Sequence, residues 1–342
     1  MARLYKFVLL VYSKFYSGLF SKRREIFRLL ARFFRFCFLK KKTSFDLKVR
    51  TYDGSNQAVH PDILFDENFQ RYILVYTPYP FGFDCYENPS VMYGKTLSHL
   101  KAANPNPISF SEINLPQCHL CDPALVQDDR KFYCFFLDVL NFDNVRKCVF
   151  YYSDSDDAIH WSMKKIIKYY SFDGSTKEHV LCPGVIKYGN DFYFYTVHVN
   201  VGVGSFLFLS KAESIENFKN DEKCVINNIP EGYYLWHLNI CFSNDYSKTH
   251  SGDEDEELLG LFLLRKKGEA AVYKTVFAVS RDFHTWDITG ELQIPDEIKQ
   301  VAASVYKGTV IPNTGEVLIS YKDKNKFWRM AIIPNKIISL EA

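Results

Sequence analysis

The stretch His60-Pro61-Asp62-Ile63-Leu64-Phe65 places an aspartate and a proline just ahead of a short apolar run. It is echoed by Cys121-Asp122-Pro123-Ala124-Leu125-Val126, in which the aspartate comes sixty residues after Asp62. A third copy, Cys182-Pro183-Gly184-Val185-Ile186, follows after a further sixty residues. Each copy leads through a polar turn into an aromatic run, so this period predicts a repeat of small antiparallel units.

Five such units fit into the chain after residue 43. Each has an apolar inner strand, a turn, an aromatic strand and a third strand, and the inner strands begin near residues 62, 122, 182, 237 and 302. Several strands in each repeat of this length are typical of a β-propeller, whereas a two-sheet sandwich, the chief alternative, does not explain the regular spacing. We therefore predict an all-β chain with a five-bladed β-propeller over residues 43–342. The pair Gly189-Asn190 predicts a tight hairpin in the third blade.

The composition favours strands and a reducing compartment. The chain has 23 Tyr, 30 Phe and 47% hydrophobic residues, which is enough for a large core rich in strands. Its nine cysteines are odd in number and several, such as Cys134, lie within apolar runs, which indicates buried thiols in a cytosolic protein. Cys118 and Cys121 form a single Cys-X-X-Cys pair around His119, and one pair alone is weak evidence for zinc. No metal or cofactor is predicted.

Residues 1–42 differ from the remainder of the chain. They hold twelve Lys and Arg against Glu25, a charge of +11, so the other 300 residues carry −9 of the net +2. The acidic body argues against nucleic-acid binding. The apolar runs of the segment are too short to span a membrane, but residues 22–42 have the pattern of an amphipathic helix. We expect this basic arm to lie on the anionic inner face of a membrane, which makes the protein cytoplasmic and peripheral; the alternatives are a helix packed on the body or a basic leader.

The aspartates at the inner-strand starts are expected to converge, because the inner strands of a propeller line one channel. Asp62 and Asp122 would then share a cavity, where close carboxylates acquire different pKa values, as the cleavage of a glycosidic bond requires. The alternative is that each aspartate only accepts backbone N–H bonds at the end of a strand.

The repeat, the Asp122-Pro123 motif and the outer segments Ser153 to Trp161 and Ser280 to Trp286 resemble the five-bladed propeller glycosidases of the arabinanase, xylosidase and fructosidase group. The resemblance covers about residues 58–335. The segment from His60 through Tyr86-Glu87-Asn88-Pro89 is also similar to uncharacterised bacterial and phage glycosidase-like propellers.

The resemblance implies three catalytic roles. An aspartate that opens blade one acts as general base or nucleophile, an aspartate of blade two tunes its pKa and orientation, and a glutamate of a later blade is the acid. Asp62 matches the first role and Asp122 the second, but Leu181-Cys182-Pro183-Gly184 offers no acid in blade three. Glu87 is the first choice for the acid, because Asn88-Pro89 restricts the chain beside it. Glu178 and Glu231 follow in that order.

A second set of side chains is expected to contact the sugar. Its members lie at inner-strand starts or in the loops of blade one. They are His60, Asp84, Tyr86, Asn88, Trp236 and His237. A single histidine beside a channel is more often a hydrogen-bonded polar residue than a metal ligand, and most aromatic residues serve blade packing.

The sequence thus predicts a carbohydrate-active enzyme of glycoside-hydrolase type that acts on an oligosaccharide or polysaccharide. Two alternatives stay open. One is a glycosyltransferase of bacterial surface-polysaccharide assembly, which the basic arm favours. The other is a non-catalytic glycan-binding propeller, which the missing acid of blade three favours.

Overall fold

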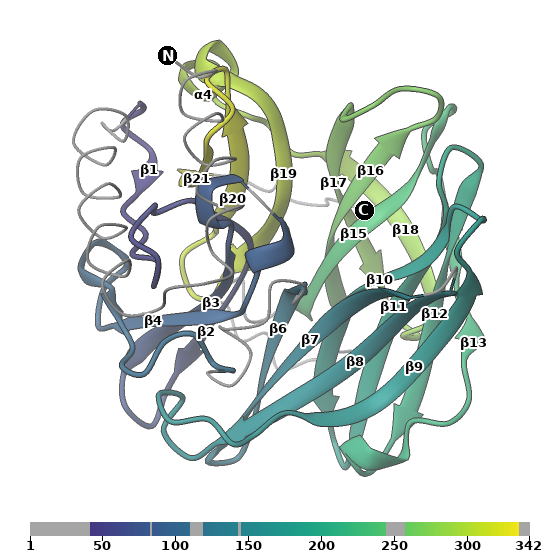
Figure 1. The fold of residues 1–342 in the computed structure, drawn as a ribbon, viewed down its shortest axis with the longest axis horizontal. Helices are drawn as coiled ribbons and strands as arrows, with labels where there is room; N and C mark the ends of the chain where they lie inside the picture. The colour runs from purple at the N-terminus through teal and green to yellow at the C-terminus, as the bar shows by residue number, and fades with distance from the viewer. Residues whose placement is uncertain (1–41, 83, 110–118, 143–144, 244–256, 335–342) are drawn as a thin grey trace.

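The computed structural model describes residues 42–82, 84–109, 119–142, 145–243 and 257–334, which form five sheets arranged as the blades of a propeller (Figure 1). This confirms the predicted all-β, five-bladed architecture. The basic arm over residues 1–42 lies outside the described residues, apart from Lys42, so the arm and its membrane contact stay predictions. In the described part of the chain, no helix is long and apolar enough to cross a bilayer.

Within each blade the strands follow one another from the inner to the outer edge. Blade one has β2 (Ala58–Asp66), β3 (Arg71–Pro78), β4 (Ser90–Gly94) and β5 (Lys101–Ala102); blade two has β6 (Leu120–Asp128), β7 (Lys131–Phe142), β8 (Val145–Ser155) and β9 (Lys165–Asp173). Blade three has β10 (Glu178–Tyr188), β11 (Asp191–Asn200), β12 (Gly204–Ala212) and β13 (Glu222–Lys223). Blade four has β15 (Tyr233–Phe242), β16 (Leu258–Lys266), β17 (Tyr273–Ser280) and β18 (Thr285–Glu291), to which β14 (Val225–Asn227) adds in parallel. Blade five has β19 (Ala302–Ile311), β20 (Glu316–Asp323) and β21 (Trp328–Pro334).

The ring is closed by a strand that precedes the first repeat. The short strand β1 (Asp46–Leu47) pairs with β21 and so completes the blade formed by the C-terminal strands. The Tyr321 hydroxyl donates a hydrogen bond of 2.6 Å to Asp46 Oδ1, which fixes this junction. Residues 46–47 carry no signal of the repeat, so this closure is not predicted from the sequence.

Helical structure is confined to short connections. These are the 3-10 turns η1 (Pro80–Gly82), η2 (Asp84–Tyr86), η3 (Leu97–His99) and η5 (Ile215–Asn217) and the α-helix α4 (Asp296–Val301). The predicted hairpin of blade three is confirmed, because Tyr188 pairs with Asp191 across Gly189, whose φ of 55° suits glycine.

The hydrophobic core lies between the blades. Five clusters of buried side chains each join one blade to the next, and the cluster with Ile63, Leu74 and Ile311 joins blade one to blade five. The alternating apolar residues of each twisted sheet therefore pack against two neighbouring sheets, which holds the ring closed.

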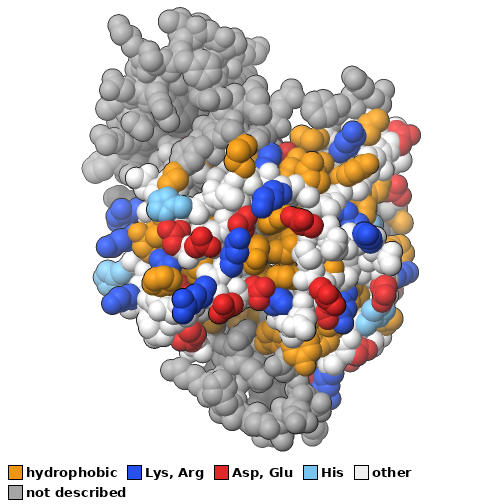
Figure 2. Space-filling view, turned by 90° about the horizontal axis from the view of Figure 1, so that it is seen from below, with side chains coloured by type: hydrophobic (Ala, Val, Ile, Leu, Met, Phe, Trp, Pro, Cys, Tyr) orange, Lys and Arg blue, Asp and Glu red, His pale blue; other side chains and the backbone are white. Residues whose placement is uncertain are grey.

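The two outer segments that carried the family resemblance have a structural role. Asp157 Oδ1 accepts the backbone N–H groups of Ile159 and His160, each at 2.8 Å. Asp282 Oδ1 accepts those of His284 and Thr285 in the same way, and Trp286 behind it is fully buried. Both aspartates thus order a turn at the outer edge of a blade. On the face shown in Figure 2, acidic and basic side chains are intermixed around apolar ones, unlike the basic stripe of a nucleic-acid-binding surface.

Candidate functional site

Each of the five inner strands contains a β-bulge near its start. The pairing with the second strand shifts between Val59 and Asp62, Cys121 and Ala124, Leu181 and Gly184, Leu235 and His237, and Val305 and Gly308. A bulge redirects side chains and tolerates proline, which cannot donate a ladder hydrogen bond. His60 and Asp122, each followed by proline, have φ values of 52° and 53°.

Asp122 lies where these bulges meet. Its Oδ1 lies 3.4 Å from His237 Nδ1, 3.5 Å from His60 Nε2 and 3.5 Å from Lys307 Nζ. Four blades therefore contribute to one cluster, in which Asp122 is 1% exposed and His237 is 2% exposed. We call Asp122, His60, His237 and Lys307 the axial cluster.

Burial and charge set the protonation of the axial cluster. Burial alone would raise the pKa of Asp122, but His237, His60 and Lys307 outweigh it and hold that pKa well below its usual range. Burial lowers the pKa of His60 to about 4 and that of His237 to about 3, despite the attraction of Asp122. Burial also opposes the charge of Lys307, yet Asp122 raises its pKa. The cluster at neutral pH is thus a carboxylate, an ammonium and two neutral imidazoles.

Tyr306 and Trp236 fix the orientation of the His237 ring through its Nε2 side. The Tyr306 hydroxyl lies 2.6 Å from His237 Nε2 and accepts the indole N–H of Trp236 at 3.0 Å. Nδ1 of His237, on the opposite side of the ring, has no hydrogen-bond partner among the described residues. This buried nitrogen faces the Asp122 carboxylate.

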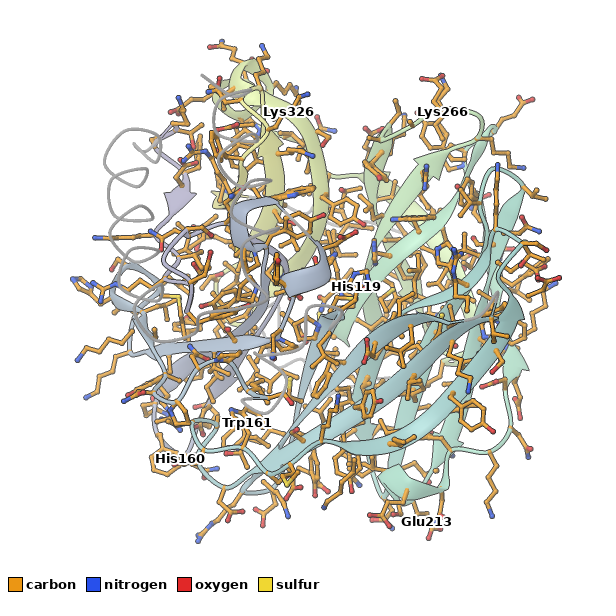
Figure 3. All side chains as sticks on the ribbon, in the orientation of Figure 1. His119, His160, Trp161, Glu213, Lys266 and Lys326 are labelled. Carbon is orange, nitrogen blue, oxygen red and sulfur yellow. The ribbon has the colours of Figure 1, made fainter. Side chains whose placement is uncertain are left out.

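A second pair of titratable groups comes from the loops of blades one and two. His119 Nε2 lies 2.8 Å from Glu87 Oε2, and Glu87 is 1% exposed. Burial raises the pKa of Glu87 to about 7, against the opposing effect of His119. Burial disfavours the charged form of His119, but the pairing with Glu87 prevails and raises its pKa to about 9. His119 lies in the middle of the ring (Figure 3), whereas His160 lies at its edge.

Two groups of donors have the spacing of metal ligands. The ligand atoms of His60, Asp122 and His237 lie within 4.8 Å of one another, and so do those of Glu87, His119 and Cys121. Burial raises the pKa of the Cys121 thiol well above its usual value, so this thiol does not offer the thiolate that metals prefer. The first group is therefore the better cation site.

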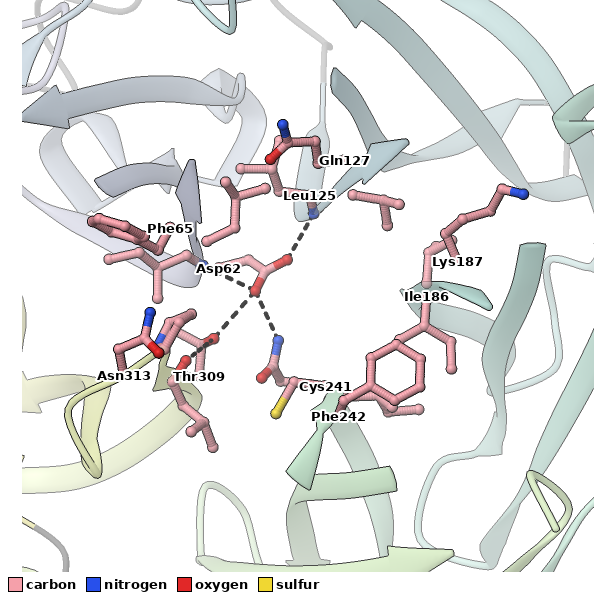
Figure 4. A pocket seen from close by; sticks show the side chains of 18 of the residues that line it. Asp62, Phe65, Leu125, Gln127, Ile186, Lys187, Cys241, Phe242, Thr309 and Asn313 are labelled. Atoms are coloured by element: carbon pink, nitrogen blue, oxygen red, sulfur yellow. Dashed lines mark hydrogen bonds between the residues drawn. The ribbon is translucent and has the colours of Figure 1, made fainter. Parts of the chain in front are cut away.

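Asp62 does not join Asp122. Its carboxylate accepts hydrogen bonds from Leu125 N at 2.7 Å, Asn239 Nδ2 at 2.8 Å and Thr309 Oγ1 at 3.1 Å (Figure 4). It lines a cavity of about 430 Å³ with residues farther along the inner strands, and no member of the axial cluster lines that cavity. This cavity therefore does not support the expectation that Asp62 and Asp122 share one cavity, and the catalytic role of Asp62 stays a prediction.

The reason is a shift in register. Val75, the fifth residue of β3, pairs with Asp62, while Phe135, the fifth residue of β7, pairs with Ala124. The counterpart of Asp62 in blade two is thus Ala124, and the counterpart of Asp122 is His60. The turn between β2 and β3 spans residues 67–70 and is two residues longer than the turn at 129–130 between β6 and β7. The two extra residues offset the shift of the inner strand, so the next strands, β3 and β7, begin sixty residues apart.

The other residues predicted for the site either have structural roles or lie near the axial cluster. The Asn88 side chain donates to Ser109 O at 2.9 Å and so fixes the loop after Glu87, while Asp84 and Tyr86 lie in the turn η2 before it. Trp236 is in the bulge of β15 beside the axial cluster. Glu178, at the start of β10, and Glu231 are not among the residues that contact Asp122.

Sequence reasoning missed three participants: His119, Tyr306 and Lys307. His119 was noticed only inside the Cys-X-X-Cys pair. Lys307 is 2% exposed in the otherwise uncharged strand β19, and a lysine at such a position is a signal that could have been found.

No protein-family model and no curated protein sequence matches the chain. Solved structures do match. An N-acetylgalactosamine deacetylase from F. plautii, solved with blood group B trisaccharide, has a TM-score of 0.65 at 14% identity, over 86% of this chain and 94% of that one. An endo-arabinase from Bacteroides thetaiotaomicron has a TM-score of 0.52 at 16% identity, over 87% and 99% of the two chains. A family-43 endo-arabinanase from Bacillus licheniformis has a TM-score of 0.54 at 12% identity, over 83% and 95%. The chain has the propeller fold of these carbohydrate-active enzymes, among which are glycoside hydrolases.

Proposed function

We propose that this protein is a carbohydrate-active hydrolase centred on the axial cluster, and that it removes the acyl group of an N-acylated sugar. The observation that carries the proposal is the position of His60, which fills the place in blade one that Asp122 fills in blade two. Instead of two facing carboxylates, the centre has one carboxylate between two imidazoles. Such a donor set suits a catalytic divalent cation held by three protein ligands.

The residues fit a cation on structural grounds. Nδ1 of His237 is buried without a hydrogen-bond partner in the described structure and lies 3.4 Å from Asp122 Oδ1. An unprotonated nitrogen and a carboxylate oxygen repel each other unless a proton or a cation lies between them. Tyr306 can accept the Nε2–H of His237 together with the Trp236 N–H, which leaves Nδ1 as the ligand atom. When bound, the cation would supply Lewis acidity toward the carbonyl oxygen of the substrate.

Glu87 and His119 supply the proton transfers. Glu87, whose pKa is raised to about 7 by burial, can take a proton from the attacking water near neutral pH. The water oxygen bonds to the acyl carbon, the carbon–nitrogen bond breaks, and the amine leaves with a proton. His119 is protonated near neutral pH, because its pairing with Glu87 outweighs burial and raises its pKa to about 9. It holds Glu87 in place and can donate its proton to the leaving amine, and the proton that Glu87 took from water then replaces the one that His119 gave up.

Hydrolysis of a glycosidic bond is the second candidate, and Lys307 favours it. Its ammonium already lies 3.5 Å from Asp122 Oδ1, so the carboxylate has a positive neighbour without a metal ion. Glu87 and Asp122 have pKa values shifted in opposite directions, by burial and by the cationic surroundings respectively. This is the pattern of a glycosidase acid and its ionised partner.

One experiment separates the two candidates. The purified chain is incubated with N-acetylated and arabinan-type oligosaccharides, and released acetate and new reducing ends are measured before and after treatment with a chelator. Acetate release that stops with the chelator and returns with Mn²⁺ or Zn²⁺ supports deacylation. New reducing ends that persist in the chelator support the second candidate and overturn the first. The exposed variant His160→Ala, far from the axis, is the control.

A further inference from the structure

We propose that an anion-binding subsite lies beside the axial cluster, formed by Arg265, Arg146 and His179 around Trp236. The substrate would carry an anionic group, a carboxylate or a phosphate, on a sugar next to the reacting one. This inference rests on the proposed function, since it takes the occupant to be a saccharide. We call these four residues the basic rim.

The basic rim lies on the same face as the axial cluster. His179 is near the start of β10 and Trp236 is in the bulge of β15, while Arg265 is near the end of the neighbouring antiparallel strand β16, where it pairs with Tyr234. The Trp236 indole contacts Tyr306, which in turn contacts His237. A single indole ring therefore connects the basic rim to the proposed ligand of the centre.

Arg265 differs from the paired arginines of the described structure. Arg71, Arg281 and Arg329 each contact a carboxylate within ion-pair distance. Arg265 instead stacks on Trp236, with its Cζ 4.4 Å from the ring centroid, and among the described residues no carboxylate lies within ion-pair distance of it. Stacking fixes the plane of a guanidinium and leaves its N–H edge able to bind a planar anion.

The surroundings of Arg265 add one further positive charge, that of Arg146, and the neutral ring of His179. The His179 ring lies 5.6 Å from Trp236 and nearly perpendicular to it. Burial, together with the charges of Arg146 and Arg265, lowers the pKa of His179 to about 4. Arg146 itself donates a hydrogen bond of 3.5 Å to Glu178 O, which holds it at this rim.

An anionic sugar would satisfy this arrangement better than a neutral one. The half-buried Arg265 can form two parallel hydrogen bonds with a carboxylate, and such charge-assisted bonds are about twice as strong as neutral ones. Trp236 supplies an apolar edge for the sugar ring. The basic rim thus selects a substrate by charge at a position next to the bond that is cleaved.

The test is a binding titration with three oligosaccharides that differ at one carbon. One has a hydroxymethyl group, one has the carboxylate of a uronic acid, and one has a phosphate ester. We expect the wild-type chain to bind an acidic ligand about tenfold more tightly than the neutral one. Arg265→Gln should remove this preference and leave affinity for the neutral ligand unchanged. The control Arg281→Gln removes the same charge from a distant, exposed position and should keep the preference.

The variant Arg265→Lys is the control for a folding defect. It keeps the charge but loses the planar fork, so it should retain part of the preference, with an unchanged melting temperature. The proposal is overturned if the wild type binds acidic and neutral ligands equally, or if Arg265→Gln keeps the preference. The acidic ligand that binds more tightly identifies the anionic group.

The readout also separates this inference from the proposed function, because binding needs no turnover. A preference that depends on Arg265 without release of acetate or reducing ends supports the subsite and overturns the hydrolase. Turnover without any charge preference supports the hydrolase and overturns the subsite. Failure to bind any of the three ligands overturns the subsite.

Discussion

Asp62 Oδ2 accepts the backbone N–H of Leu125 at 2.7 Å, so a carboxylate of blade one holds the inner strand of blade two. Its Oδ1 accepts hydrogen bonds from Asn239 in blade four and Thr309 in blade five. Burial raises the pKa of Asp62, which these hydrogen bonds only partly oppose. One buried side chain thus ties four inner strands together around the axis.

We therefore expect Asp62→Asn to lower the free energy of unfolding more than it lowers the rate of turnover. The amide cannot accept hydrogen bonds on both atoms, so at least one buried donor loses its partner, at a cost of about 1–3 kcal/mol. Chemical denaturation measures the change, and Thr309→Val, which removes one of the donors, should cost about 1 kcal/mol. Normal stability with complete loss of turnover would instead restore Asp62 as a catalytic carboxylate.

Asp122→Asn should abolish both activity and cation binding and should also destabilise the chain. It leaves the buried Lys307 ammonium without its counter-charge, and breaking such a pair costs about 3–5 kcal/mol. The double variant Asp122→Asn with Lys307→Met should regain stability but not activity. Thermal unfolding and Mn²⁺ titration follow the two effects separately, and full activity in either variant would remove Asp122 from the reaction centre.

Tyr306→Phe should weaken cation binding about 10–100-fold, as the loss of a hydrogen bond behind a ligand does elsewhere. The hydroxyl orients His237 from Nε2, while the ring packs between His237 and Trp328 and is retained in the variant. Isothermal titration with Mn²⁺ or Zn²⁺ gives the affinity. Tyr273→Phe, which keeps the ring contact with Tyr306 at 5.1 Å, is the matched control. Equal affinities in the two variants would mean that Tyr306 has no orienting role.

The pH profile should report the role of Glu87. Burial raises its pKa to about 7, so a rate that needs its ionised form should rise about tenfold per pH unit below 7 and level off above it. His119, with its pKa raised to about 9 because the attraction of Glu87 exceeds the effect of burial, should set a decline at higher pH. A rate that falls as pH rises through 7 would show Glu87 acting as an acid, as the glycosidic candidate requires. Glu87→Gln should remove the dependence together with the activity.

Much of the site was predicted from the sequence. Asp122, His60 and His237 were selected because they lie at the starts of inner strands, and Glu87 because Asn88-Pro89 restricts the chain beside it. His119, Tyr306 and Lys307 were missed, since the repeat pattern does not specify the second residue of a bulge or the path of a loop. The ring-closing contact of Asp46 was also missed, because two residues are too few to show a period.

By itself, the sequence determined the five-bladed ring. Apolar inner strands followed by polar turns and apolar or aromatic strands recur with each blade, and proline marks the inner strands of the first three blades; these are local properties that remain readable without coordinates. Only the tertiary structure decided which side chains meet at the axis. That choice depends on where each strand breaks register and on the length of the turn that follows. In blade one the shift in register of the inner strand and the two extra residues of the following turn cancel along the chain. The sixty-residue spacing therefore concealed that His60, and not Asp62, is the counterpart of Asp122.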